Sequence, residues 1–305
     1  MRARLLAGSL GALSLLLASP AAAFALETNK EFKPQNEFKL DPLVPIELGP
    51  VDLSITKAVI YLLLASIATC VTMVYIARRM EGRPNRVQTA VEAAYDLTST
   101  QMTRGNIGPP AIAGRWFAFI ATLFFFIWFN NMIGYIPLPT STEHSIEIFG
   151  LQLPTFALYA ATANISVPLA LTLVVWFSYH VEGIRAKGVV KYFKGWIPAG
   201  VEGKIAPFVF IIEVLSQLVR LVSLSARLFA NILAGHLLIL LMAGGMVVLL
   251  GISIGLIGSV ILGVFTGGIA VLFYLFEVGL VASLQAYIFA TLSAIYLGEA
   301  VAEEH

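Results

Sequence analysis

Charged residues are scarce in this chain: Asp, Glu, Lys and Arg make up 12% of its 305 residues, about half the share of an ordinary soluble domain. Hydrophobic residues make up 58%. The formal net charge of +1 gives no extended basic surface, which argues against a nucleic-acid-binding protein. The composition predicts an all-α, polytopic membrane protein that lies in a lipid bilayer.

Cysteine is almost absent, since the sequence contains only Cys70, inside an apolar run. A single cysteine excludes an intramolecular disulfide and a metal site built on several thiolates. We interpret Cys70 as a small buried hydrophobic residue. The sequence also lacks metal-ligand spacing, a phosphate-binding glycine loop and a plausible Ser, His and Asp nucleophile arrangement. No cofactor and no enzyme active site are therefore expected.

The first 25 residues have the features of a signal peptide. Arg2 and Arg4 precede an apolar core at residues 5–17, and small residues suited to cleavage follow at 20–25. An uncleaved anchor is the alternative, and either would deliver residues 26–52 to the outside as an external N-terminal arm. A single membrane domain is expected at residues 53–298, followed by a cytoplasmic tail at residues 299–305.

Three apolar segments, at about 53–77, 112–136 and 156–179, are long enough to cross a hydrocarbon core of about 30 Å. Basic clusters follow the first and the third, whereas the loop at 137–154 contains no Lys or Arg. The positive-inside rule therefore predicts an external N-terminus and a cytoplasmic C-terminus. Residues 87–102 are weakly amphipathic and predict a helix on the cytoplasmic surface.

Two longer helices are expected near the C-terminus, forming a hairpin. The first begins at Pro207 and meets no helix breaker before Gly244, apart from Gly235. Its length would be about 55 Å against a hydrocarbon core of about 30 Å, so it must be tilted or bent. The second covers about 252–297, which makes about five membrane helices in all.

A polar stripe runs along the first of these helices. At about 100° per residue its members fall within an arc of roughly 120°. Such a stripe indicates an ion pathway, although polar contacts between helices would produce it too. Its members are Glu213, Ser216, Gln217, Arg220, Ser223, Arg227 and Asn231.

Arg227 is energetically the most costly member of the stripe. Placing an arginine at the bilayer centre costs roughly 2.5–3.5 kcal/mol of insertion free energy, and the guanidinium does not lose its proton. No acid stands three or four residues away on either side. Its charge must be satisfied by water, by another helix of this chain, or by a carboxylate on another protein.

His236 projects to nearly the opposite side of the helix from Arg227, so the two cannot share a partner. Its natural counterpart is Glu277, the one acid within the apolar part of the last helix, with Gln285 two turns further on. A histidine beside a carboxylate can relay protons near neutral pH, and a static buried ion pair is the alternative.

These residues resemble a known family. The stretch Ser223-Leu-Ser-Ala-Arg227-Leu-Phe-Ala-Asn231-Ile-Leu-Ala-Gly-His236, followed by Leu284-Gln285-Ala-Tyr-Ile-Phe289, closely resembles subunit a of bacterial F-type ATP synthase. The resemblance extends over about residues 49–297 and includes Gly82-Arg-Pro-Asn-Arg-Val-Gln-Thr-Ala-Val-Glu92.

The resemblance implies a proton-translocating stator subunit of the F0 sector in the bacterial plasma membrane. Arg227 would face the ionisable carboxylate of the c-subunit ring, and the ring would decide whether H⁺ or Na⁺ is carried. Further partners would be the b-subunit stalk and the rest of the complex. Glu213, Arg220 and Ser223 would lie toward the cytoplasmic half-channel. The outer half-channel would be lined by Asn231, His236, Glu277 and Gln285.

Two positions depart from the family pattern. Glu277 stands eight residues before Gln285 instead of seven, so the two would share a face only if a π-bulge absorbs the extra residue. Thr162 stands where the family often has an acid, which weakens an outer-channel role there. A secondary transporter with an intramembrane arginine for an anionic substrate is the alternative function, although the inverted repeats it would require are not found.

Overall fold

The computed structural model describes residues 40, 42–48, 51–52, 54–78, 86–136, 146–148, 151–153, 160–197, 201, 205–240 and 246–302. The predicted signal peptide and most of the predicted N-terminal arm lie outside these residues. The chain divides into two compact units. One contains residues 237–274, and the other contains residues 39–236 and 275–305.

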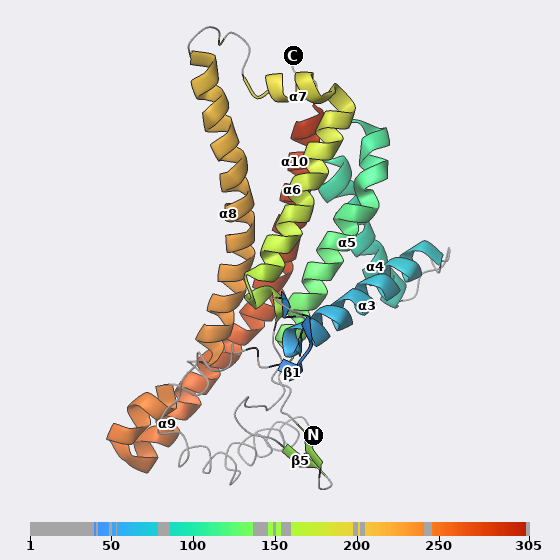
Figure 1. Ribbon diagram of the computed structural model, residues 1–305. Helices are drawn as coiled ribbons and strands as arrows, with labels where there is room; N and C mark the ends of the chain where they lie inside the picture. The colour runs from blue at the N-terminus through green and yellow to red at the C-terminus, as the bar shows by residue number, and fades with distance from the viewer. Residues whose placement is uncertain are drawn as a thin grey trace. The chain divides into compact units, whose positions relative to one another are not determined.

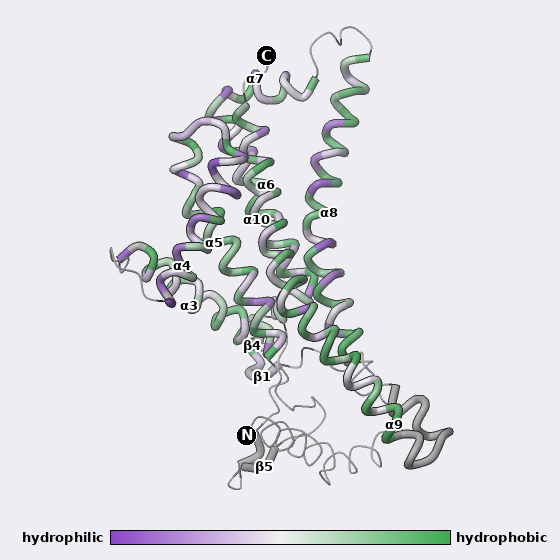
Figure 2. The backbone as a smooth tube through the Cα atoms, turned by 180° about the vertical axis from the view of Figure 1, so that it is seen from behind, coloured by the Kyte–Doolittle hydropathy of each residue, from purple (hydrophilic) through white to green (hydrophobic). Residues whose placement is uncertain are grey.

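Five described helical segments are long and apolar enough to cross a membrane, which confirms the all-α, polytopic prediction. The hydrophobic colouring along their backbones is visible in Figure 2. The last crossing is a continuous helical segment made of α9, η6 and α10. The segments are α3 (Lys57–Arg78), α5 (Pro110–Gly134), α6 (Ser166–Lys187), α8 (Ala206–Leu240), α9 (Met246–Phe276), η6 (Glu277–Val281) and α10 (Ala282–Val301).

Short antiparallel strand pairs are the only β-structure in the described part of the chain. Each strand has two or three residues, far fewer than the 9–11 or so of a membrane-spanning strand. They therefore leave the all-α classification unchanged. The pairs are β1 (Pro42–Val44) with β4 (Ile55–Thr56), β2 (Glu47–Leu48) with β3 (Val51–Asp52), and β5 (Ile146–Ile148) with β6 (Leu151–Leu153).

The third span lies further along the chain than the expected 156–179. A short 3₁₀ turn, η3 (Ala161–Ala163), precedes α6, and the Asn164 side-chain oxygen accepts a hydrogen bond from the Ser166 N–H at 3.0 Å. Pro168 then falls in the first turn of α6, where its missing N–H leaves no hydrogen bond unmade. These local features start the helix ten residues later than hydropathy alone suggests.

The expected amphipathic helix is present, but it is not confined to a surface. It begins as α4 (Arg86–Asp96) and continues as a π-helix, η2 (Leu97–Arg104). Thr98, Met102 and Thr103 of η2 are fully buried, and η2 packs against α5 and α10. Polar threonine side chains can be buried here because they bond backbone carbonyls, as Thr103 does with Thr98 at 2.7 Å.

The core forms where α10 packs against α5 and α6. Residues four apart on α10 are small and buried, which allows the neighbouring helices to approach closely, as in other membrane bundles. The row is Ala282, Ala286, Ala290, Ala294 and Gly298.

The prediction for Cys70 was wrong, because its side chain is exposed on α3. The neighbouring residues Ile67, Val71 and Val74 are also exposed. This face of α3 covers no other described element, so an apolar residue there was mistaken for a core residue.

Up to His236, α8 runs antiparallel to α10 and beside α6 (Figure 1). One row of its residues, Leu224, Leu228 and Ile232, is buried, and Leu224 lines a small cavity together with residues of α6 and Tyr296 of α10. The predicted antiparallel arrangement and contact of the two long helices is confirmed for this part of α8.

Candidate functional site

An exposed polar row lies beside the buried row of α8. Ser223, Arg227 and Asn231 are exposed, whereas each of their next neighbours, Leu224, Leu228 and Ile232, is buried. The same helix therefore packs against its own chain along one edge and presents Arg227 outward along the next. A spacing of four residues keeps the three polar side chains on one face.

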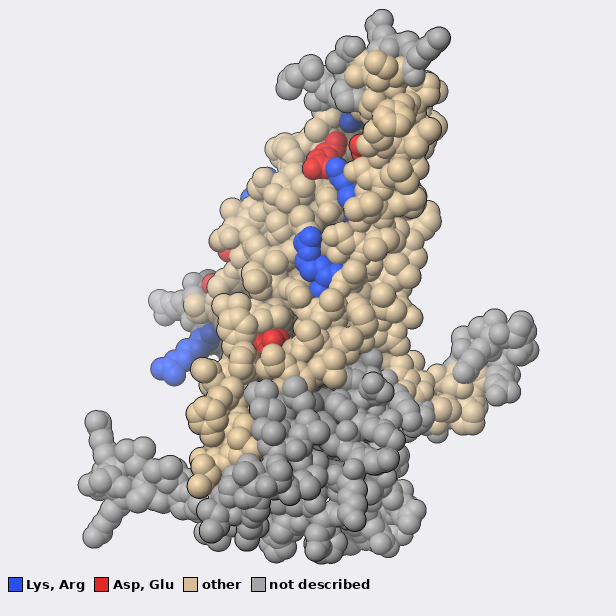
Figure 3. Space-filling view, turned by 90° about the vertical axis from the view of Figure 1, so that its left-hand side faces the viewer, with Lys and Arg blue, Asp and Glu red and all other residues tan. Residues whose placement is uncertain are grey.

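Within the described part of the chain, no ion pair or hydrogen bond holds the Arg227 guanidinium. The basic side chains visible in Figure 3 stand on a largely uncharged face. An arginine remains charged in such surroundings. No described residue of the chain therefore serves as the counter-ion of Arg227.

A second group of polar residues lies nine residues further along α8, around His236. The Tyr135 hydroxyl donates a hydrogen bond to Glu277 Oε2 at 3.1 Å. The rings of Tyr135 and His236 lie against each other, with centroids 4.5 Å apart. The expected pairing of His236 with Glu277 is thus indirect, because Tyr135 contacts both.

The backbone fixes the imidazole of His236. Nδ1 lies 2.9 Å from the Ile232 carbonyl oxygen, and Nε2 lies 3.0 Å from that of Gly134. Carbonyl oxygens only accept hydrogen bonds, so a neutral ring donates to one of them and a charged ring donates to both. In either form, both ring nitrogens are directed at the backbone.

The predicted π-turn is present at Glu277. Segment η6 is a π-helix in which the Ala282 N–H bonds the Glu277 carbonyl oxygen, five residues back. This turn holds one residue more than an α-turn and so absorbs the extra residue before Gln285. Gln285 is buried and Glu277 is partly exposed.

Two buried polar residues stabilise the end of this π-turn. Asn131 Nδ2 donates to the Ala282 carbonyl oxygen at 3.1 Å, and Thr162 Oγ1 donates to Asn131 Oδ1 at 2.8 Å. All three residues are fully buried. Thr162 therefore acts through Asn131 on the backbone of the last helix.

A third group lies near the start of α8. Gln217 Nε2 donates to Glu213 Oε1 at 2.8 Å, and the Tyr179 hydroxyl donates to Gln217 Oε1 at 2.8 Å. Gln217 thereby connects Glu213 to α6. The glutamate is partly exposed and has room to exchange protons with water.

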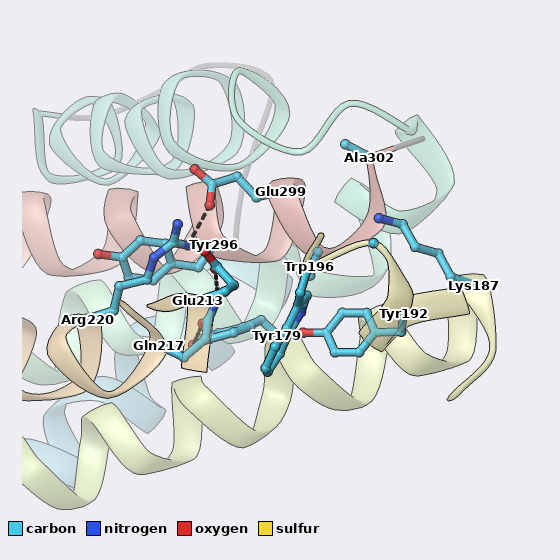
Figure 4. A pocket seen from close by; sticks show the side chains of 12 residues that line it. Tyr179, Lys187, Tyr192, Trp196, Glu213, Gln217, Arg220, Tyr296, Glu299 and Ala302 are labelled. Atoms are coloured by element: carbon cyan, nitrogen blue, oxygen red, sulfur yellow. Dashed lines mark hydrogen bonds and ion pairs between the residues drawn. The ribbon is translucent and has the colours of Figure 1, made fainter. Parts of the chain in front are cut away.

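Arg220 points into the same region from α8 and contacts α10. Its guanidinium donates to Glu299 Oε2 at 2.6 Å and lies 5.1 Å from the centroid of the Tyr296 ring. Figure 4 shows this ion pair at the edge of a pocket that Glu213 and Gln217 also line. The pocket has a volume of about 340 Å³. At about 30 Å³ per water molecule it can hold roughly ten waters.

The structure brings the predicted site residues together in three places along α8. Glu213 and Arg220 share the pocket, Ser223, Arg227 and Asn231 share the exposed row, and His236 lies near Glu277. Gln285 lies two turns beyond Glu277 on α10.

Sequence reasoning missed two residues of the site, Tyr135 and Glu299. It made no assignment for Tyr135 to the site and placed Glu299 in the cytoplasmic tail. The last helix instead continues to Val301, which carries Glu299 into contact with Arg220. Gly298, which often marks a helix end, does not end the helix here, so the sequence offered no clear signal for this contact.

No cluster of three or more potential metal ligands occurs among the described residues. The polar groups of the site are carboxylates, phenols, amides, an imidazole and guanidinium groups. Such groups bind and exchange protons or hold charges.

Comparison with known proteins identifies the family. Residues 59–298 match the family model of the ATP synthase A chain. The chain is 35% identical over 273 residues to ATP synthase subunit a of Bradyrhizobium diazoefficiens, covering 89% of this chain and 98% of that protein. The subunit a of Parvibaculum lavamentivorans is 33% identical over 276 residues, with 89% and 94% covered. That of Maricaulis maris is 33% identical over 273 residues, with 89% and 98% covered. The chain thus belongs to the ATP synthase A chain family.

Proposed function

We propose that this chain is the proton-translocating stator subunit of the F0 sector of ATP synthase. It catalyses no covalent chemistry itself and couples proton flow to rotation of a neighbouring ring of c subunits. Family membership favours this function over a secondary transporter for an anionic substrate.

The exposed position of Arg227 carries the proposal. A guanidinium without a partner among the described residues, on a membrane helix, requires carboxylates that arrive from another protein. Each ring carboxylate that reaches Arg227 is held in its charged form by the opposite charge. Arg227 thereby prevents a proton from passing straight across the chain. Ser223 and Asn231 flank this contact on the same face.

The two proton-exchanging groups lie on opposite sides of Arg227 along the helix. At 1.5 Å per residue, Glu213 precedes Arg227 by about 21 Å and His236 follows it by about 14 Å. No chain of described hydrogen bonds connects the group around Glu213 with the group around His236. Protons would enter by one group, travel on the ring, and leave by the other. A proton that crosses 100 mV contributes about 2.3 kcal/mol to this rotation.

The distribution of Lys and Arg supports an orientation in the bacterial plasma membrane. Basic residues gather at the end of α6 and in α7 (Val189–Lys194), near the pocket with Glu213 and Arg220. The positive-inside rule makes this the cytoplasmic end. The groups around His236 and Glu277 would then form the outer half-channel, with Asn231 and Gln285 beside them, and the N-terminus would lie outside. The b-subunit stalk would hold the chain against rotation.

Replacing Arg227 tests the proposal. Arg227→Ala should abolish ATP-driven proton pumping in membrane vesicles while the complex still assembles. Arg227→Lys should also fail, because a desolvated lysine can lose its proton. Arg104→Ala is the control, since Arg104 is an exposed arginine at the end of η2 and should leave pumping unchanged. Normal pumping by Arg227→Ala would contradict the proposed mechanism.

A further inference from the structure

Tyr135 occupies the space between the two residues assigned to the outer half-channel. It follows the end of α5 and is 4% exposed. Its hydroxyl reaches Glu277 Oε2 at 3.1 Å, and the face of its ring lies against His236. A buried phenol usually requires a polar partner for its hydroxyl, and Glu277 is such a partner here.

The contacts of His236 make direct exchange with Glu277 unfavourable. Its two ring nitrogens are directed at the carbonyl oxygens of Ile232 and Gly134. A proton on either nitrogen would have to leave a backbone hydrogen bond, and the ring would have to turn, before it reached the carboxylate. The Tyr135 hydroxyl already lies at hydrogen-bond distance from that carboxylate.

Gly235 makes this arrangement sterically possible. A β-carbon at this position would overlap the Glu277 carboxylate and approach the Tyr135 hydroxyl to 2.8 Å. Because Gly235 has no side chain, the Tyr135 phenol and the Glu277 carboxylate have room to form their hydrogen bond. The end of α5, the α8 backbone at Gly235 and η6 are therefore all needed to form this one hydrogen bond.

We propose that the Tyr135 hydroxyl is a further proton-relay residue of the outer half-channel, which passes protons to Glu277. The inference rests on the proposed function. In the relay step, the phenolic O–H bond breaks as an O–H bond forms on Glu277 Oε2. The phenol oxygen takes a replacement proton from a hydronium ion in the half-channel, which becomes water, so tyrosine is regenerated. Reversal of these transfers carries a proton outward.

Two substitutions at this position separate the hydroxyl from the ring. Tyr135→Phe removes the hydroxyl and keeps the aromatic contact with His236, whereas Tyr135→Leu removes both. Passive proton flow is measured through the F0 sector in vesicles stripped of the soluble sector, with the amount of assembled complex determined in each preparation. Tyr95→Phe is the matched control, because Tyr95 packs edge-on against Phe117 on another part of the chain.

If the hydroxyl relays protons, Tyr135→Phe slows flow by at least about tenfold and Tyr135→Leu slows it no further. Tyr95→Phe should match the wild type. Flow at the wild-type rate in Tyr135→Phe overturns the relay, whatever Tyr135→Leu does. If Arg227→Ala is inactive at the same time, the proposed function stands and only the inference on Tyr135 fails. Normal pumping by Arg227→Ala would instead overturn the proposed function itself.

Discussion

Adding a single methyl group at Gly235 should strongly reduce ATP-driven proton pumping. An added β-carbon would overlap Glu277 Oε2, so Gly235→Ala must displace the carboxylate or separate α8 from the last helix. Overpacking of this kind costs about 1–3 kcal/mol. We expect ATP-driven pumping by the assembled complex to fall by about tenfold or more, because the displaced Glu277 carboxylate loses its position against the Tyr135 hydroxyl.

The control for this substitution is Gly114→Ala on α5, because a β-carbon at Gly114 meets no atom within 4 Å. Vesicle pumping with both variants, normalised to the amount of assembled complex, measures the difference. Equal pumping by the two variants would show that Glu277 has more space than its contacts indicate.

Individual residues differed in how far the sequence could predict them. The lack of a nearby partner for Arg227 could be predicted, because no acid stands three or four residues away, which is a local property of the sequence. The hydrogen bond between Tyr135 and Glu277 joins residues 142 positions apart, and no periodicity within one helix predicts it. The contact of Glu299 with Arg220 was not predicted, because Gly298 suggested a helix end one residue earlier, whereas the last helix continues to Val301.

The π-turn at η6 shows how an insertion can be accommodated inside a membrane helix. Glu277 stands eight positions before Gln285, and the sequence predicted that a wider turn would be needed for them to share a face. The structure has this turn, and Asn131 and Thr162 hold the carbonyl of Ala282 at its end. The bulge is therefore supported by side chains of other elements.

Removal of one residue from this turn tests its role. Gly279 is exposed and a β-carbon there meets nothing, so its deletion should convert η6 into regular α-helix with little other change. Glu277 would then stand seven residues before Gln285 and keep its facing direction. We expect pumping within about twofold of wild type.

Insertion of one alanine after Gly279 is the opposite change. It would turn Glu277 by about 100° away from Tyr135 and should abolish pumping. The same vesicle assay measures both variants. A deletion that is as inactive as the insertion would mean that the wide turn is itself required.

The boundaries of two elements depended on local chemistry that hydropathy does not contain. The start of α6 follows from the Asn164 side chain and Pro168. The burial of η2 follows from threonine hydroxyl groups that bond the backbone, which makes a polar segment compatible with the interior.

The membrane spans differ in how much of their surface the chain itself covers. In the most apolar stretch of α5 and α6, 39% of residues are buried, against 17% in α8. Composition predicted five spans, but it could not say which faces meet lipid and which meet other proteins. The exposed face with Ser223, Arg227 and Asn231 is where we place the ring.

Cysteine cross-linking tests this placement. In a Cys70→Ala background, which removes the exposed native thiol, Ser223→Cys or Asn231→Cys should form disulfides with cysteines introduced into the c subunit. Leu224→Cys and Leu228→Cys are the buried controls, at 3% and 1% exposure. Comparable cross-linking at the buried and exposed positions, measured by gel shift, would contradict the assigned face.

The outward position of Arg227 has a consequence for assembly. A chain alone in lipid bears roughly 2.5–3.5 kcal/mol for this cation, a large part of the 5–15 kcal/mol that typically separates folded from unfolded domains. In the proposed complex, a ring that supplies a carboxylate would remove this penalty and stabilise the folded chain by mass action. In the proposed complex, copies of the chain made in excess of the rotor would therefore be less stable than assembled ones, and a single side chain would help to set subunit stoichiometry.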